Sequence, residues 1–353
     1  MKTAFTFALL ALAGGTTLGT DYSKERAVKV ENEFQLATET EMTTERDGQP
    51  VEGRGGGGSM KSDSTWHIVQ VDEVQAHEGK KPTKVKRSYE KVGGEASFSF
   101  GDTENTAQLE SPFEGATLQL SGDDDDVKVE FLDGKKPDHE GALVGHKLGL
   151  ALDALLPDKE VEKDAHWDLD SAQIKRALGL DLRKALYPPP PAPENAGGGG
   201  GGGGGRRGGG MGRGGGMGGI PADAEWTGKA KLVSLDEDVD GVKCAKIEIE
   251  VGAHGDLPEM QMGGGGRGRM LEPESVPPLF AGTYSAEAKG EFYFAIEGKR
   301  PVKLELEGKV ESVRDSETKR EEVVTKRHSK MQGKLKVKVA VTEAAKAKDA
   351  KGK

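Results

Sequence analysis

The residues able to do chemistry in this chain are carboxylates, histidines and a single cysteine, and their spacing predicts turns rather than a catalytic centre. Asp236–Gly241 has the D-x-D-x-D-G spacing that opens a calcium-binding helical-hand loop. The twelfth position of that loop should be a bidentate glutamate, but Ile247 stands there and both flanks have strand patterns. This segment therefore predicts an acidic hairpin turn.

The other candidate groups also lack the spacing of a metal or catalytic site. Asp123–Asp126 are four successive carboxylates, which cannot all converge on one ion without further ligands, so we expect a solvated turn. The seven histidines are scattered, without the spacing of a zinc-protease helix. Cys244 lies in a strand-like run and is expected to be buried. We expect no enzyme activity, cofactor or metal; an enzyme with carboxylates distant in sequence stays an alternative.

Basic residues alternate with apolar ones near the C-terminus. Lys334, Lys336 and Lys338 share one face of a predicted strand, and the segment Lys319–Lys353 has 12 basic and 4 acidic residues in a chain of net charge −10. Such a face could contact an anionic surface such as lipid headgroups or polysaccharide. The alternative is that these lysines protect a sheet edge from aggregation.

A glycine-rich tract divides the chain. Gly197–Gly219 contains 18 glycines with Arg206, Arg207 and Arg213, and glycine loses much backbone entropy on ordering. The tract resembles the Arg-Gly segments of RNA-binding proteins, but it lacks aromatic residues and the net charge is negative. We expect an expanded, disordered loop, like the smaller insertions at Gly53–Gly58 and Gly263–Gly268.

The elements that would position these groups are mostly strands. Apolar and polar residues alternate over long stretches separated by short turns, which is typical of an antiparallel meander. We predict a mainly β fold with minor α: long antiparallel strands in a curved meander or half-barrel, one or two short helices and Gly-rich disordered loops. Asp170 is expected to cap a helix over Ser171–Leu186, and Leu148–Leu155 predicts a shorter one.

One turn recurs with the pattern acid, Gly, base, base, Pro. It occurs at Glu78–Pro82, Asp133–Pro137 and Glu297–Pro301. Glycine is expected to supply the positive φ of the reversal, and proline to open the next strand where its missing N–H does no harm.

The N-terminus has the pattern of a secretory signal. Lys2 precedes the apolar run Ala4–Ala13, which is too short to span a bilayer, and no lipid-accepting cysteine follows. Cleavage is expected after Ala13 or nearer Gly19, giving a secreted or periplasmic protein without a transmembrane segment. The predicted organisation is a signal peptide (1–20), a strand-rich block ending in a helix (21–187), a Pro/Gly-rich linker (188–224), an antiparallel meander (225–345) and a disordered basic tail (346–353).

The stretch Leu156-Pro157-Asp158-Lys159-Glu160-Val161, followed by Trp167, resembles an element of uncharacterised secreted bacterial β-rich proteins. Those proteins are similar to the half-barrel of periplasmic lipoprotein carriers, a curved sheet that can shelter acyl chains. Asp164 stands where the family usually has glycine. The resemblance implies a fold and a compartment, and no reaction.

The leading functional hypothesis is an exported, non-enzymatic protein whose curved sheet holds a lipid or another hydrophobic ligand. The residues expected to face the ligand are Phe292, Phe294, Ile296, Leu304 and Leu306. The first alternative is an envelope structural or interaction protein that binds anionic polymer through Lys334, Lys336 and Lys338. The second is a nucleic-acid binder acting through the Arg-Gly tracts, which would require a cytosolic N-terminus.

Overall fold

The structure is a computed structural model of the 353-residue chain. The residues that it describes are 15–23, 26–52, 56–124, 126–134, 136–137, 141–187, 220–257, 279–320 and 323–344. The predicted signal core, the long glycine tract, the insertion at Gly263–Gly268 and the basic tail lie outside these ranges.

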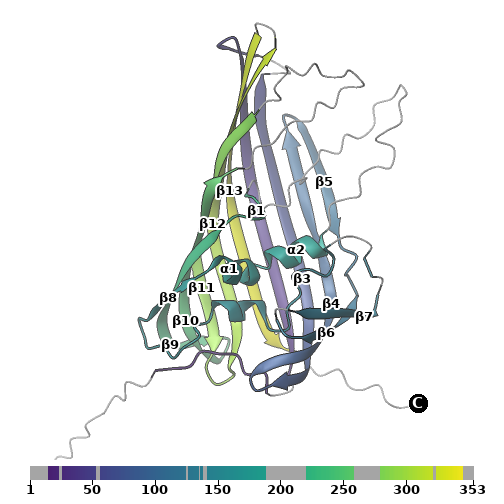
Figure 1. The fold of residues 1–353 in the computed structure, drawn as a ribbon, viewed down its shortest axis with the longest axis vertical. Helices are drawn as coiled ribbons and strands as arrows, with labels where there is room; N and C mark the ends of the chain where they lie inside the picture. The colour runs from purple at the N-terminus through teal and green to yellow at the C-terminus, as the bar shows by residue number, and fades with distance from the viewer. Residues whose placement is uncertain are drawn as a thin grey trace, which may run out of the picture.

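Within the described residues, every strand belongs to one antiparallel sheet of 13 strands (Figure 1). The strands are β1 (Ala27–Arg46), β2 (Gln49–Pro50), β3 (Gly57–Glu78), β4 (Lys81–Phe100), β5 (Thr103–Glu110), β6 (Thr117–Gly122), β7 (Val127–Asp133), β8 (His166–Leu169), β9 (Trp226–Val239), β10 (Val242–Asp256), β11 (Leu279–Ala295), β12 (Arg300–Arg320) and β13 (Val323–Glu343). Their order is β7-β6-β4-β3-β1-β13-β12-β11-β10-β9-β8, with β2 on β1 and β5 on β4. The sheet does not close, because β7 and β8 end it on opposite sides.

The pairing of β1 with β13 joins the two strand-rich parts of the chain. The register runs from Val28↔Glu343 to Arg46↔Thr325, almost the full length of both strands. The two segments on either side of the linker therefore share one sheet. β13 is also flanked by β12, so its lysines lie at the centre of the sheet. The idea that they protect an edge strand is wrong for this reason.

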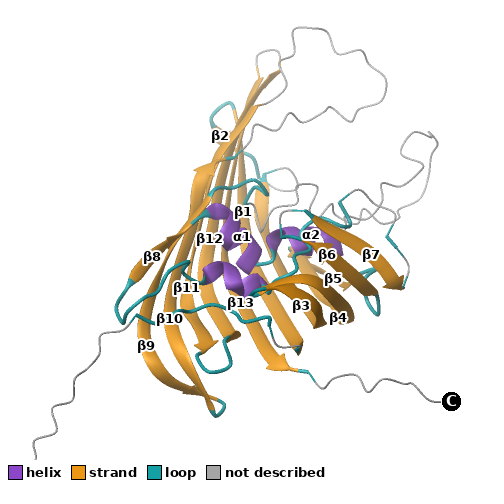
Figure 2. Ribbon diagram, turned by 60° about the horizontal axis from the view of Figure 1, so that its bottom comes forward, coloured by secondary structure: helices purple, strands orange, loops and turns teal. Residues whose placement is uncertain are grey.

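The sheet curves so that one face is concave, which confirms the predicted fold class (Figure 2). Two glycines on this face show how closely the strands approach where the sheet bends. A Cβ added to Gly94 would lie 2.1 Å from the Thr65 carbonyl oxygen, and one added to Gly290 would lie 1.8 Å from the Glu305 carbonyl oxygen. Only glycine fits such positions, and glycine kinks of this kind permit strong local curvature.

Short helices cross the concave face (Figures 1 and 2). They are a 3₁₀ turn, η1 (Ala151–Leu155), and two α-helices, α1 (Ser171–Ala177) and α2 (Leu180–Leu186). Asp170 caps α1 as predicted, in a reciprocal capping box with Gln173. The single helix predicted over Ser171–Leu186 is divided, because Gly179 takes a left-handed conformation with φ of 61° between α1 and α2.

We call residues 141–187 the insert. In the chain they lie between β7 and the linker, and in space they cover part of the concave face of the sheet. The insert has no large core of its own: its leucines and isoleucine are buried against the sheet. The buried residues are Leu148, Leu150, Leu152, Leu155, Leu156, Ile174, Leu178 and Leu186. Each fully buried side chain of this kind contributes about 1.5–3 kcal/mol. The insert therefore depends on the sheet for its conformation.

The repeated turn has different backbone conformations in different copies. Gly79 supplies a positive φ of 57° between β3 and β4, as predicted. Between β11 and β12, however, the positive φ of 45° falls on Lys299 and not on Gly298. Pro82 and Pro301 each follow the first residue of the next strand, in agreement with the prediction.

Residues 15–22 pack against the insert. Thr16 exchanges backbone hydrogen bonds of 2.8 and 3.0 Å with Val161, and Leu18 is 2% exposed. Tyr22 is buried and its hydroxyl accepts a hydrogen bond of 2.7 Å from the Leu150 amide. A signal peptide ending at position 20 would remove the contacts of Thr16 and Leu18, whereas cleavage after Ala13 would keep them.

We therefore predict that a chain beginning at Gly14 is more stable than one beginning at Asp21. The expected difference in the free energy of unfolding is about 2 kcal/mol, from the burial of Leu18. Urea unfolding of the two chains measures it, and Leu18→Ala in the longer chain is the control that isolates the side chain. Equal stability of all three would contradict a structural role for these residues.

Candidate functional site

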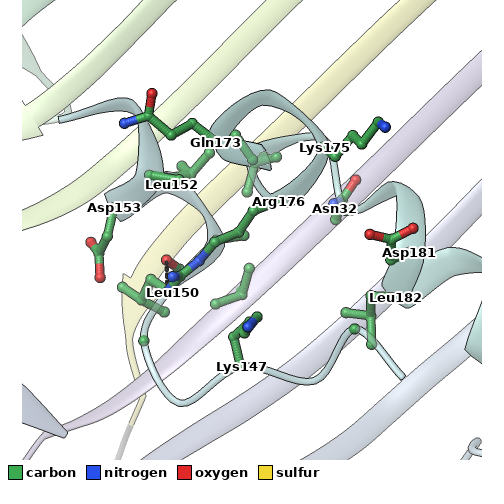
Figure 3. A pocket seen from close by; sticks show the side chains of 18 of the residues that line it. Asn32, Lys147, Leu150, Leu152, Asp153, Gln173, Lys175, Arg176, Asp181 and Leu182 are labelled. Atoms are coloured by element: carbon green, nitrogen blue, oxygen red, sulfur yellow. Dashed lines mark hydrogen bonds between the residues drawn. The ribbon is translucent and has the colours of Figure 1, made fainter. Parts of the chain in front are cut away.

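A cavity of about 730 Å³ lies between the insert and the strands β1, β3 and β13 (Figure 3). Its size falls within the range of about 300–1,000 Å³ that is usual for small-molecule sites. The strands form its floor and the insert forms its opposite wall.

The floor of the cavity is mainly apolar. Val30, Ile68, Val339 and Val341 line it from the concave face. Asn32 interrupts this surface: it pairs with Val339 on one side and Ile68 on the other, in a row that continues to Leu304 and Val92. The period-2 pattern of β1 predicts an apolar residue at this position, so the asparagine is a departure that packing alone does not explain.

The wall formed by the insert is mixed. Leu150 and Leu152 offer apolar side chains, while Lys147, Asp153 and Arg176 offer charged ones, as Figure 3 shows. The cavity therefore has one apolar surface and one amphipathic surface. Such a combination suits a molecule with an apolar body and a polar group.

Asp124 fixes the loop that bounds the cavity. Its carboxylate lies 2.7 Å from Arg176 Nη1 and accepts hydrogen bonds from the amides of Leu148 (3.0 Å) and Gly149 (3.4 Å). Lys147 Nζ donates to the Asp124 carbonyl oxygen. Burial of Asp124 opposes ionisation, but Arg176 and the two amides outweigh it and lower the pKa of the carboxyl. Asp124 belongs to the acidic run Asp123–Asp126, for which the sequence predicted a solvated turn. Its carboxylate is instead engaged by Arg176 and two backbone amides.

Asp153 is a second carboxyl at the cavity, with a different environment. Burial raises its pKa to about 6, although donors from Thr20 (2.5 Å) and Tyr22 and the charge of Arg176 oppose this shift. Tyr22 and Thr20 come from the N-terminal segment described above. They therefore link that segment directly to the wall of the cavity.

A buried ion pair lies at the margin of the cavity. Arg87 Nε and Nη2 each donate to one oxygen of Asp72 at 2.7 Å, and Arg87 also donates to the Lys147 carbonyl oxygen at 3.1 Å. The two side chains are 4% and 3% exposed. Gln70 Nε2 lies 3.2 Å from Asp72 as a further donor. The pair thus connects β3, β4 and the insert.

His146 lies beside this pair and is 3% exposed. Its Nδ1 is 3.3 Å from the Tyr89 hydroxyl, and its Nε2 is buried without a hydrogen-bond partner among the described residues. Burial, reinforced by the charge of Arg87, lowers the pKa of His146 to about 3. The imidazole is therefore neutral at physiological pH.

The residues predicted to face a ligand lie on the same concave face but not in the cavity lining. Phe292, Phe294, Leu304 and Leu306 are at most 2% exposed, and Ile296 packs against them. They belong to the part of the core that lies over β11 and β12. Sequence alternation thus identified the face, while the cavity lies over neighbouring strands.

The predicted anion-binding lysines lie on the convex face. Lys336 Nζ is 2.5 Å from Glu307, and Lys338 stands between Glu33 and Glu305 in the register. Lys334 stands opposite Lys309. Carboxylates on neighbouring strands therefore balance much of this basic row.

The remaining sequence candidates are structural. The predicted acidic hairpin turn lies between β9 and β10, at Asp240 and Gly241, while Asp236 to Val239 belong to β9; Gly241 N donates to Asp238 at 2.9 Å. Cys244 is buried. The described part of the chain holds no cluster of three or more potential metal ligands. Among the same residues, no helix is both long and apolar enough to cross a membrane.

The sequence did not predict the residues that line the cavity, because they come from separate parts of the chain. Asn32, Lys147 and Arg176 are distant in the chain and meet only because the insert folds back over β1 and β13. The one local signal was Asn32, a polar residue at an apolar position of an alternating strand.

The sheet, the insert and the cavity define a class: an open, curved antiparallel sheet with a short helical insert over its concave face. No protein-family model matches the chain, and no curated protein matches it. Among solved structures, it is similar to the InvG secretin domain β-barrel from the Salmonella SPI-1 injectisome NC-base, at 8% identity and a TM-score of 0.16. The match covers 93% of this chain and 66% of that one, just under two thirds. At this TM-score it supports no inference about function.

We predict that Arg87→Met lowers the free energy of unfolding by about 3–5 kcal/mol, because it leaves the Asp72 carboxylate buried and unpaired. The double variant Asp72→Leu/Arg87→Met should recover most of this loss, since neither charge then remains. Lys336→Met, on the exposed pair of the convex face, is the control and should cost far less. A double variant as unstable as Arg87→Met would contradict this account.

We also predict that His146 makes the fold sensitive to acid. The unfolded chain binds a proton on this residue below about pH 6.5, and the folded chain only below about pH 3, so stability falls as the pH drops through this window. Relative to wild type, His146→Gln should gain about 2 kcal/mol between pH 7 and pH 5. Urea unfolding at both pH values tests this, with exposed His254→Gln as the control; a constant difference would refute it.

Proposed function

We propose that the protein binds an amphipathic small molecule, such as an acyl-chain lipid, in the cavity between the insert and the sheet. The observation that carries the proposal is the cavity of about 730 Å³ with an apolar floor and an amphipathic wall. Apolar ligand surface would lie against Val30, Val339 and Val341, where its removal from water is favourable. The polar group would meet the charged side chains of the insert.

The build of the insert supports a binding role over a purely structural one. If the insert served only to shield the concave face from water, close packing on the whole face would give the greatest stability. Over β9 to β12 the insert does pack closely. Over β1, β3 and β13 it instead leaves space and places Lys147, Asp153 and Arg176 at its border. Each of these charged groups has a partner within the protein, and together they give the border of the cavity a polar surface that could face the polar part of a ligand.

We also infer that the protein acts outside the cytoplasm, because its first residues have the pattern of a secretory signal. The envelope-polymer alternative has less support, since carboxylates flank Lys336 and Lys338 on the neighbouring strands. Salt-sensitive binding to cell-wall material, lost when Lys334, Lys336 and Lys338 are changed to Gln, would favour that alternative. The nucleic-acid alternative rests on the Arg-Gly tracts, which lie outside the described residues.

We predict that Val30→Trp, which fills the floor of the cavity, reduces the binding of the apolar fluorophore N-phenyl-1-naphthylamine at least tenfold. The indole would occupy the space that the ligand needs. Val69→Trp is the matched control, because Val69 is on the same strand system but points to the convex face. Urea unfolding verifies that both variants fold.

Fluorescence titration and native mass spectrometry of the purified protein give the readout. Saturable binding by wild type and by Val69→Trp, with loss in Val30→Trp, supports the proposal. Absence of binding by wild type, or equal binding by both tryptophan variants, would refute it.

A further inference from the structure

Arg183 on α2 is a cation that has no carboxylate partner within the described part of the chain. Its guanidinium carbon lies 3.8 Å from the centre of the Phe34 ring and 5.1 Å from the centre of the Trp66 ring. Its Nη1 is buried and has no hydrogen-bond partner among the described residues. Stacking on aromatic faces offsets part of the desolvation of a guanidinium, but it leaves the in-plane N–H donors unsatisfied. This donor can therefore serve an acceptor that the described chain does not supply.

Of the other cations that line the main cavity, three are already engaged, whereas Lys175 is only half-buried and has no partner among the described residues. Arg87 donates to both oxygens of Asp72, Arg176 pairs with Asp124, and Lys147 donates to a carbonyl oxygen. Burial lowers the pKa of Arg183 to about 10, so it remains protonated at neutral pH. Arg183 thus presents a positive charge that is neither neutralised nor fully hydrated.

A side space of about 10 Å³ adjoins this guanidinium. Arg183, Phe34, Trp66 and Leu178 line it, together with Asn32, Ile68 and Gly179, which also line the main cavity. The two spaces are therefore neighbours, and Asn32 borders both of them. The side space is at the lower limit for holding one water molecule, so a larger polar group would have to lie at its border with the main cavity. This arrangement places the unpaired guanidinium next to Asn32, one of the two amide side chains that the strands contribute to the cavity lining, the other being Gln70.

We propose that Arg183 and Asn32 bind the anionic head of an amphiphile whose apolar chain lies in the main cavity. This inference rests on the proposed function and makes the ligand class specific: a single anionic group on a flexible apolar chain. A carboxylate at the border of the two spaces would accept a charge-assisted hydrogen bond from Nη1, which is stronger than one between neutral groups. The chain would then run over Val30 towards Val339 and Val341.

The experiment compares dodecanoate with dodecanamide, which share a chain and differ in the charge of the head. Isothermal titration at pH 8 should show that wild type binds dodecanoate at least tenfold more tightly. Arg183→Met should abolish this preference while leaving the affinity for dodecanamide within about twofold. Arg183→Lys should keep part of the preference. Lys184→Met removes a neighbouring charge on the same helix and should behave as wild type.

Each outcome separates the inference from the proposed function. Equal binding of the two compounds by wild type, or a preference that survives in Arg183→Met, overturns the anionic-head inference and leaves the cavity as the binding site. Loss of affinity for both compounds in Arg183→Met assigns the residue to holding the insert on the sheet, which also overturns it. Binding of neither compound by wild type refutes the proposed function itself. The comparison in wild type needs no variant to fold.

Discussion

The constraint on which this structure depends is the apolar concave face of an open sheet. In a closed barrel the strands cover their own inner side, but here β7 and β8 are left as edges and the concave face must be covered by another part of the chain. The insert provides that cover. Because its own elements are short, with α1 and α2 of seven residues each, it is stable only against the sheet. Sheet and insert therefore require each other.

The insert is attached by two different kinds of contact, and this difference creates the cavity. Over β9 to β12, Ile174, Leu152 and Leu155 pack tightly against apolar side chains. Over β1, β3 and β4, individual polar contacts predominate: the Tyr187 hydroxyl donates to the carbonyl oxygens of His67 and Gly93, and Arg183 stacks on Phe34. Point contacts hold the insert at a distance where close packing would have filled the space.

The extent to which the sequence predicted this arrangement follows from the range of each interaction. Period-2 alternation and short turns are local, so the strands, the hairpin at Asp236–Gly241 and the Asp170 cap were predictable. The division of the helix at Gly179 was not, because glycine is tolerated within helices and its left-handed conformation depends on tertiary packing. The pairing of β1 with β13 and the contact of Asp124 with Arg176 join distant residues, for which a single sequence contains no signal.

The polar residues on the concave face indicate where the sheet serves something other than stability. Asn32 and the Asp72–Arg87 pair occupy positions where the strand pattern favours apolar side chains. Replacing a buried ion pair by well-packed apolar residues is often neutral or stabilising, so stability alone does not require such groups. They also do not mark a general tolerance of polar residues, because Phe292, Leu304 and Val337 on adjacent strands follow the apolar rule. Asn32, Gln70, Asp72 and Arg87 lie on β1, β3 and β4 beneath or beside the cavity, which is the distribution expected when a binding surface and not the packing of the core determines the residue. The buried serines of β12, Ser312 and Ser316, lie outside the cavity lining and are not explained in this way.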